Sequence, residues 1–115
     1  FAEIRALHYQ MVLHYTRREL APYFQINQLI HEKILAAAAN PLLVQMYQTL
    51  SGRIRRARYV ANMSEDRWAQ AIEEHEEMLS ALASRNGQSL ANVLRRHLSN
   101  KCETVKAHLR QEAAT

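Results

Sequence analysis

The sequence predicts an all-α fold, an antiparallel helical bundle of about five helices, and composition and periodicity both favour it. Among the 115 residues there are only 2 Gly and 2 Pro, whereas Ala, Leu, Glu, Gln and Arg are abundant. These are good helix formers, so helix is favoured along nearly the whole chain. No segment shows the alternation of apolar and polar residues that is typical of a strand. A chain of this length forms one domain with one substantial core.

Helix boundaries follow from proline and from capping residues. The first predicted helix runs from Phe1 to about Tyr15 and begins without a capping residue, as the remainder of a longer element would. A second helix begins near Pro22, because proline is tolerated in a first turn. It ends at Asn40, which is placed to close this helix and to cap the next one. Pro41 then takes the first position of the third helix.

The remaining two helices are delimited in the same way. The third helix extends to about Asn62, and Ser64 is a suitable N-cap for the fourth. The pair Asn86-Gly87 is suited to a left-handed cap at the end of the fourth helix. Ser89 can cap the fifth helix, predicted over residues 90–110.

Composition excludes several classes of protein. No run approaches the roughly 20 apolar residues of a membrane span, and the start of the chain lacks the organisation of a signal peptide. The single cysteine, Cys102, excludes an intrachain disulfide framework and suits a reducing cytoplasm, which is the location we expect. The net charge of +4 is compatible with an anionic partner but does not by itself indicate one.

A cluster of arginines lies in the third predicted helix, at Arg53, Arg55, Arg56 and Arg58. At 100° per residue they fan around most of the helix, so they do not form a flat stripe for DNA. One interpretation is a solvated helix end whose cations complement the C-terminal dipole. The other is that Arg53 or Arg58 turns inward and binds an anion. Arg58 is the stronger candidate because it borders the apolar stripe of this helix.

Three histidines lie at the same phase on the apolar stripes of three helices: His31, His75 and His97. Each follows a large apolar residue by seven positions (Phe24, Trp68 and Leu90). A histidine on an apolar stripe is commonly a core residue bonded to a polar neighbour. Three buried imidazoles would be costly, however, and a shared divalent metal ion would offset that cost. Asn27 precedes His31 by one turn and shares its face.

Two alternative functions stay open at this point. A metal held by three histidines resembles hydrolytic zinc centres, but an enzyme would need an inward-facing general base. The glutamates around His75 are predicted to lie on flanking or solvated faces (Glu73, Glu74, Glu76 and Glu77). The second alternative is a metal-free helical interaction module. The other histidines are interpreted as flanking, surface or helix-end residues (His8, His14 and His108).

Several segments together resemble the FCD domain, the C-terminal effector-binding domain of GntR-type bacterial transcription regulators of the FadR subgroup. The segment 23–31 and the following residues 36–43 are similar to its metal-binding helix and turn. Glu74-His75 with the apolar residues after it is similar to a further helix of the family, and Arg95–Leu98 matches its final "HL" helix. The resemblance extends from about residue 20 to residue 105.

This resemblance implies a function. Members are homodimeric repressors or activators whose N-terminal winged-helix domain binds operator DNA. Their FCD domain binds a small organic acid, often through a divalent metal held by an acidic residue and three histidines. Carried over by position, these ligands are Asn27, His31, His75 and His97. Residues 1–115 would then be a single regulatory domain without the winged helix and with the family's first helix missing or shortened, unable to bind operator DNA by itself.

This sequence departs from the family's ligand pattern at Asn27, where the family has an acidic ligand. An amide oxygen can coordinate a metal but brings no charge. Four neutral ligands would leave the ion its double positive charge and attract an effector carboxylate, with Arg53 or Arg58 adding a charge-assisted hydrogen bond. Three nitrogens and one oxygen do not choose sharply among zinc, nickel and manganese. Effector binding would shift the helix packing and, through the dimer, the spacing of the DNA-binding domains.

Overall fold

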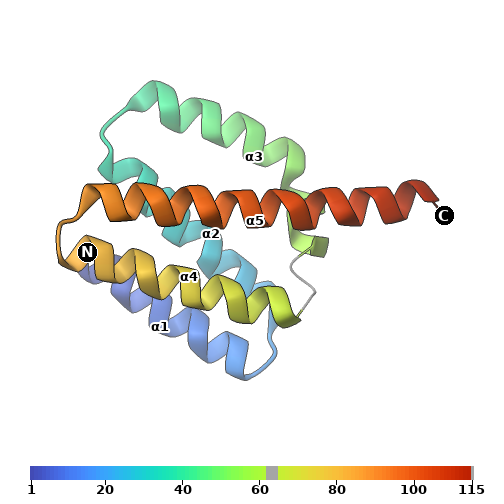
Figure 1. The fold of residues 1–115 in the computed structure, drawn as a ribbon, viewed down its shortest axis with the longest axis horizontal. Coiled ribbons are helices and arrows are strands. Elements are labelled where there is room, and N and C mark those ends of the chain that lie inside the picture. Colours follow the sequence, from blue (N-terminus) through green and yellow to red (C-terminus); the bar gives the residue numbers. More distant parts are fainter. Residues whose placement is uncertain (62–64, 115) are drawn as a thin grey trace. The chain divides into compact units, whose positions relative to one another are not determined.

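A computed structural model describes residues 1–61 and 65–114, and in this part the chain is all-α (Figure 1). The described residues form five helices and no strand: α1 (Ala2–Thr16), α2 (Leu20–Ala37), α3 (Pro41–Ala61), α4 (Glu65–Ala83) and α5 (Gly87–Ala114). The predicted fold class and the number of helices are confirmed. The predicted end of the third helix at Asn62 and the Ser64 cap lie outside the described residues.

The chain divides into two compact units, one over residues 2–56 and the other over residues 57–115 together with Phe1. In the first unit α1 and α2 lie side by side, joined by a short turn (Figure 1). Their apolar faces are buried at Ile4, Met11, Tyr23, Phe24 and Ile30. Burial of these large side chains is the main driving force for this pairing.

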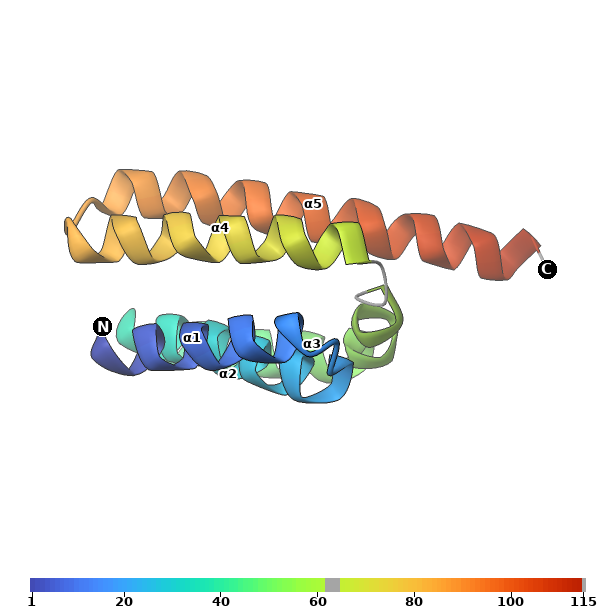
Figure 2. The ribbon, with the colours of Figure 1, turned by 90° about the horizontal axis from the view of Figure 1, so that it is seen from below.

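In the second unit α4 and α5 form an antiparallel pair (Figure 2). With 28 residues α5 is longer than α4, which has 19, so the C-terminal part of α5 extends past the start of its partner. The buried apolar side chains of this unit are Trp68, Ala71, Ile72, Met78, Ala81 and Val93. His75 and His97 lie on these same buried faces.

The turn between α4 and α5 differs from its prediction. The residue with left-handed backbone is Arg85, at φ 54°, whereas Gly87 has no positive φ and begins α5. The Asn86 amide donates to the Ala81 carbonyl at 2.9 Å, which closes α4. The side-chain oxygen of Asn86 then accepts from the Ser89 amide at 3.0 Å. Asn86 is therefore the N-cap of α5, and the predicted cap at Ser89 is wrong because that residue already lies in the first turn.

The turn between α2 and α3 confirms one prediction and refines another. The side-chain oxygen of Asn40 accepts from the Leu43 amide at 3.1 Å, so Asn40 is the N-cap of α3 and Pro41 its first residue. The left-handed residue that ends α2 is Ala39, at φ 55°. Asn40 thus caps the following helix, and Ala39 supplies the reversal of the chain.

One side of α3 is apolar and exposed. The large exposed side chains on it are Leu42, Leu43, Met46, Leu50 and Ile54. The apolar stripe that the sequence shows on this helix therefore faces solvent over residues 42–54. Among the described helices, none combines the length and the apolar character that a membrane crossing requires.

Candidate metal centre

His75 on α4 and His97 on α5 form a buried pair. Their exposed fractions are 2% and 0%, and the ring centroids lie 5.0 Å apart in an edge-to-face arrangement. The helical phase explains this position, because His75 lies four residues after the buried Ala71 and His97 four residues after the buried Val93. Antiparallel packing of α4 against α5 then brings the two inward faces together.

Glu74 fixes the orientation of the His97 ring. Its Oε1 atom lies 2.8 Å from His97 Nδ1, and both side chains are buried. An ionised carboxylate is only an acceptor, so the His97 Nδ1 atom carries a proton and donates a hydrogen bond to Glu74. The lone pair of a neutral His97 is then on Nε2, and a ring nitrogen of this kind is what a metal ion binds. Histidines that bind a metal usually donate their other ring N–H to a carboxylate or a carbonyl in this way, and this hydrogen bond orients the ring.

Glu74 belongs to a larger buried network. Its Oε1 also accepts from Arg67 at 3.0 Å, and its Oε2 accepts from Asn100 at 2.6 Å. The prediction that Glu74 lies on a flanking or solvated face is wrong, since only 4% of this residue is exposed. The inward face of α4 is wide enough to bury Glu74 beside His75, and Arg67 and Asn100 satisfy its oxygens. The neighbouring Glu73, Glu76 and Glu77 are exposed, as predicted.

The network controls the charges of its members. Burial by itself raises the pKa of Glu74, but hydrogen bonds from His97, Asn100 and Arg67 outweigh this effect and hold the pKa at about 2. Burial lowers the pKa of His97, although the hydrogen bond to Glu74 opposes the shift. At neutral pH Glu74 is therefore charged and His97 is neutral, the state in which imidazole binds metals.

In the other unit, Asn27 and His31 lie one turn apart on the buried face of α2. Their exposed fractions are 1% and 7%. Neither side-chain atom of Asn27 has a hydrogen-bond partner in the described part of the chain. A buried amide without a partner costs free energy, so such a group indicates a ligand or a solvent molecule beside it. Its oxygen is of the donor type that accepts a metal as a weak ligand.

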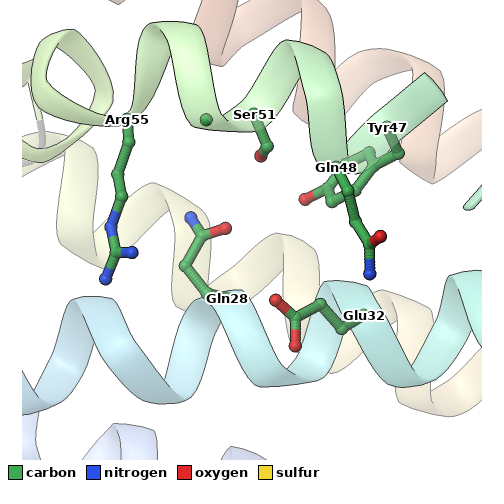
Figure 3. Close-up of a pocket in the computed structure, with 7 residues that line it drawn as sticks. Gln28, Glu32, Tyr47, Gln48, Ser51 and Arg55 are labelled. Atoms are coloured by element: carbon green, nitrogen blue, oxygen red, sulfur yellow. The ribbon is translucent and has the colours of Figure 1, made fainter. Parts of the chain in front are cut away.

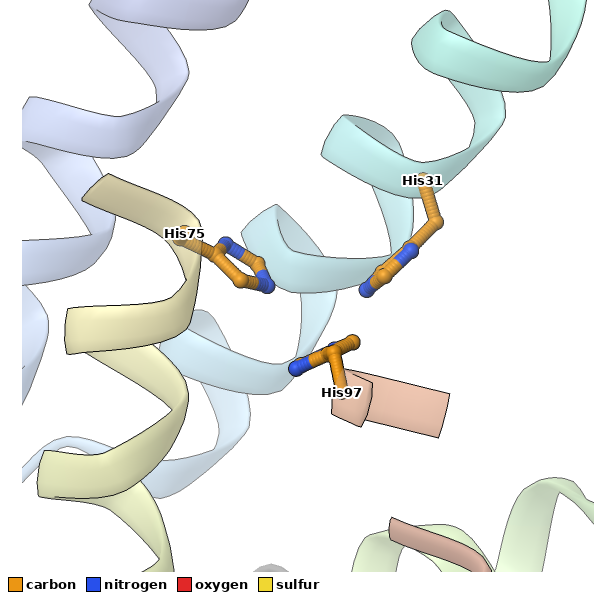
Figure 4. Close-up of side chains that lie close together, drawn as sticks. All are labelled: His31, His75 and His97. Atoms are coloured by element: carbon orange, nitrogen blue, oxygen red, sulfur yellow. The ribbon is translucent and has the colours of Figure 1, made fainter. Parts of the chain in front are cut away.

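The three predicted histidines are a group that could hold a metal ion (Figure 4). His31, His75 and His97 each offer one ring nitrogen, and these nitrogens lie within 4.8 Å of one another. Figure 4 draws the three side chains, His31 on α2, His75 on α4 and His97 on α5. Three buried imidazoles at this spacing could hold a metal ion, and they suit a zinc-like divalent cation.

The two predicted effector-binding arginines differ in environment. Arg53 is exposed on α3, whereas Arg58 at the end of the same helix is only 6% exposed.

Two further buried cations, Arg67 and Lys101, were missed by sequence reasoning. Their signal was their spacing: Lys101 follows His97 by four residues and Arg67 precedes Glu74 by seven, so each shares the inward face of its helix. His8 on α1 was also misassigned, since it is buried and not a surface residue.

A separate cavity of about 200 Å³ lies between α2 and α3 (Figure 3). It is lined mainly by polar side chains, with Gln28 and Glu32 from α2 opposite Arg55, Ser51, Gln48 and Tyr47 from α3. None of the predicted metal or effector residues lines it.

A comparison of the sequence with models of protein families identifies the family to which the chain belongs. The model of the FCD domain matches residues 1–100, most of the chain. The chain belongs to the FCD domain family. FCD domains belong to regulatory transcription factors. No curated protein and no solved structure matches the chain. The three histidines lie within the matched FCD segment, whereas Lys101 lies just beyond it.

Proposed function

We propose that this FCD domain is the effector-sensing domain of a GntR-type transcription regulator of the FadR subgroup, and that it binds a small carboxylate with the help of a metal ion. The observation that carries the proposal is the cluster of buried histidines within an FCD domain. Operator DNA would be bound through an N-terminal winged-helix domain. The regulator would act in the cytoplasm as a homodimer. Sedimentation analysis of the chain can test whether it forms a dimer.

The ligands in this proposal are His31, His75 and His97, with Asn27 as a weaker fourth ligand. Two observations support this set. Asn27 has a buried amide without a protein partner in the described part of the chain, and Glu74 holds the Nδ1 atom of His97. A bound zinc, nickel or manganese ion would supply a double positive charge that the four neutral ligands leave uncompensated, attracting a carboxylate.

Arg58 is the stronger of the two arginines for binding the effector. It is buried at the end of α3, so a hydrogen bond from its guanidinium would be shielded from water and salt. Arg53 is exposed, and a contact from it would be screened. Effector binding would then bias the helix arrangement, and the dimer would pass this change to the DNA-binding domains.

The hydrolase alternative gains no support from Glu74, the buried carboxylate closest in sequence to His75. A general base needs a pKa near the working pH, whereas the pKa of Glu74 is about 2. Its oxygens are also occupied by His97, Arg67 and Asn100. Glu74 therefore suits the support of a ligand and not proton transfer.

The test is elemental analysis of the purified chain, followed by thermal shift with a panel of small carboxylic acids. We expect about one divalent ion per chain, and at least a tenfold loss of metal affinity in His75→Ala. His108→Ala is the matched control, because His108 is partly exposed near the end of α5. Stabilisation by an acid should disappear when chelator removes the metal.

Three results would contradict the proposal. Stabilisation by an acid that ignores chelator would rule out the metal-assisted mechanism. Absence of a stoichiometric metal, with the histidine variants changing only stability, would favour the metal-free interaction module. Metal-dependent turnover of ester or phosphate substrates that is lost in His75→Ala would favour the hydrolase.

A further inference from the structure

The cavity between α2 and α3 is lined by two opposite charges that do not pair with each other (Figure 3). Glu32 reaches it from α2, and Arg55 reaches it from α3. Within the described residues, neither side chain takes part in a hydrogen bond or an ion pair. All the lining residues belong to the compact unit of residues 2–56. One unit by itself therefore presents an unpaired carboxylate and an unpaired guanidinium to the same cavity.

Gln28 indicates that a ligand binds between these charges. Its side-chain nitrogen is buried and has no hydrogen-bond partner in the described part of the chain. Figure 3 shows this amide pointing from α2 toward α3, on the side of Arg55. Exposed charges are solvated and need no partner, but a buried N–H group without an acceptor costs free energy. A ligand with an acceptor oxygen near Gln28 and Arg55 would remove this cost.

Gly52 keeps the α3 wall of the cavity free of a side chain. It lies within α3 and has no positive φ, so the backbone does not require glycine there. A Cβ atom at this position would meet no atom within 4 Å, so close packing does not require glycine either. Glycine in the interior of a helix is destabilising. The effect of Gly52 is to leave space in the wall of the cavity.

A second cavity, of about 360 Å³, adjoins the first along the same two helices. The two cavities share Glu32, Tyr47 and Gln48. Beyond these shared residues the second cavity has mainly apolar walls, made by Leu29, Leu35, Ala36 and Val44. Lys33 also lines it, but its ammonium group is paired with Glu3 at 3.1 Å. The polar cavity therefore continues into an apolar groove.

The polar and apolar groups follow one another in a fixed order. Along α2 the order is Gln28, Glu32 and Ala36, each one helical turn after the last. Along α3 the cavities extend from Arg55 back to Val44, over three turns. Donors for a carboxylate therefore come first, an acceptor for a cation second and apolar walls third. An α-amino acid carries a carboxylate, an ammonium group and a side chain that match this order.

We propose that the α2–α3 cavity binds a free α-amino acid with an apolar side chain. Arg55 and Gln28 donate hydrogen bonds to its carboxylate, and Glu32 accepts from its ammonium group. Its side chain lies in the apolar groove, against Leu35 and Val44. Because Glu32 and Arg55 are exposed, each charged contact is partly screened, and selectivity comes from meeting all three requirements together. This site goes beyond the proposed function, since it needs no metal ion.

The test is calorimetric titration of the metal-free chain with L-leucine. Three related compounds each lack one group of L-leucine: isocaproate has no ammonium group, isopentylamine has no carboxylate, and glycine has no apolar side chain. We expect L-leucine to bind at least tenfold more tightly than each of them. No binding of L-leucine, or binding no tighter than that of glycine, overturns the inference.

Two charge variants assign the contacts. Arg55→Gln should lower the affinity for L-leucine to that for isopentylamine, because the carboxylate loses its cation. Glu32→Gln should lower it to that for isocaproate, because the ammonium group loses its anion. Arg56→Gln and Glu73→Gln are the matched controls, since both residues are exposed and line neither cavity. Equal binding in the two charge variants and the native chain overturns the assignment of this cavity.

Gly52→Met fills the cavity without changing either charge. Methionine favours helix more than glycine, so the fold should persist, and circular dichroism checks it. We expect at least a tenfold loss of affinity for L-leucine, whereas Thr49→Met, on an exposed position of α3 outside both cavities, should bind normally. Unchanged binding in Gly52→Met overturns the inference. Because these titrations contain no metal, that result leaves the proposed function standing, and a chain that takes up no metal could still bind L-leucine here.

Discussion

Glu74 lies next to His75 in the sequence but supports His97 on the neighbouring helix. Its carboxylate holds the Nδ1 proton of His97 and is in turn held by Arg67 and Asn100. The carboxylate therefore has two roles, orienting one proposed metal ligand and neutralising a buried guanidinium. Both roles need its negative charge and not only its shape.

Glu74→Gln keeps the size of the side chain and removes its charge. We expect metal affinity to fall about 10- to 100-fold, because the imidazole loses the carboxylate that orients it. Stability should fall by roughly 3 kcal/mol, because Arg67 loses its buried counter-charge. Competition with a chromophoric chelator and urea unfolding measure the two effects. Glu73→Gln is the control, since Glu73 is exposed; equal losses in both variants would contradict the assigned role.

The stability of the chain should depend on the charge of Glu74 in acid. The pKa of this group is lowered from 4.5 to about 2 in the folded chain, so its contribution is complete above about pH 4.5 and is lost as the pH falls toward 2. The loss should amount to about 2 to 3 kcal/mol. Urea unfolding between pH 6 and pH 2.5 measures it. The difference between the native chain and Glu74→Gln should shrink over this range; parallel curves would contradict the prediction.

At the scale of the helices, the turns reverse the chain with residues other than glycine. The left-handed positions are Arg18, Ala39 and Arg85. A side chain with a Cβ atom is strained in this conformation by roughly 1 kcal/mol. Asn40 and Asn86 offset part of this cost by capping α3 and α5. The turns before α3 and α5 thus combine a strained residue with a capping asparagine immediately after it, whereas Glu19, which follows Arg18, makes no side-chain cap hydrogen bond.

Ala39→Gly should stabilise the chain by about 1 kcal/mol, because glycine adopts the left-handed conformation without strain. The same substitution inside α2, Ala36→Gly, should destabilise it by roughly 0.5 to 1 kcal/mol. Both positions are exposed, so packing should change little. Chemical denaturation gives the two free energies of unfolding. A loss of stability in Ala39→Gly would show that the turn differs from the described one.

At the scale of the whole molecule, the proposed ligands come from both compact units. Asn27 and His31 belong to the unit of residues 2–56, and His75 and His97 to the unit of residues 57–115. A metal ion shared by these ligands would link the folding of the two units. Ligand binding to the folded state would also stabilise it by mass action, by about 2.7 kcal/mol at a hundredfold excess over the dissociation constant.

Hydrogen exchange should therefore respond to metal in both units. We expect zinc to slow exchange of the amides of α2 as well as those of α4 and α5, because opening of either unit would have to release the ion. His31→Ala should abolish the protection of α2. His14→Ala, on the partly buried end of α1, is the control. Protection confined to α4 and α5 in the native chain would contradict a shared ion.

The sequence by itself determined the helical class, the Asn40 cap and the common phase of the three histidines, because each depends on neighbours within about one turn of helix. Tertiary structure decided what lies opposite each buried face. Glu74 was predicted on a flanking or solvated face, and the structure buries it with partners on both α4 and α5. Helical phase states which side of a helix a residue occupies, but only packing states which partner it meets there.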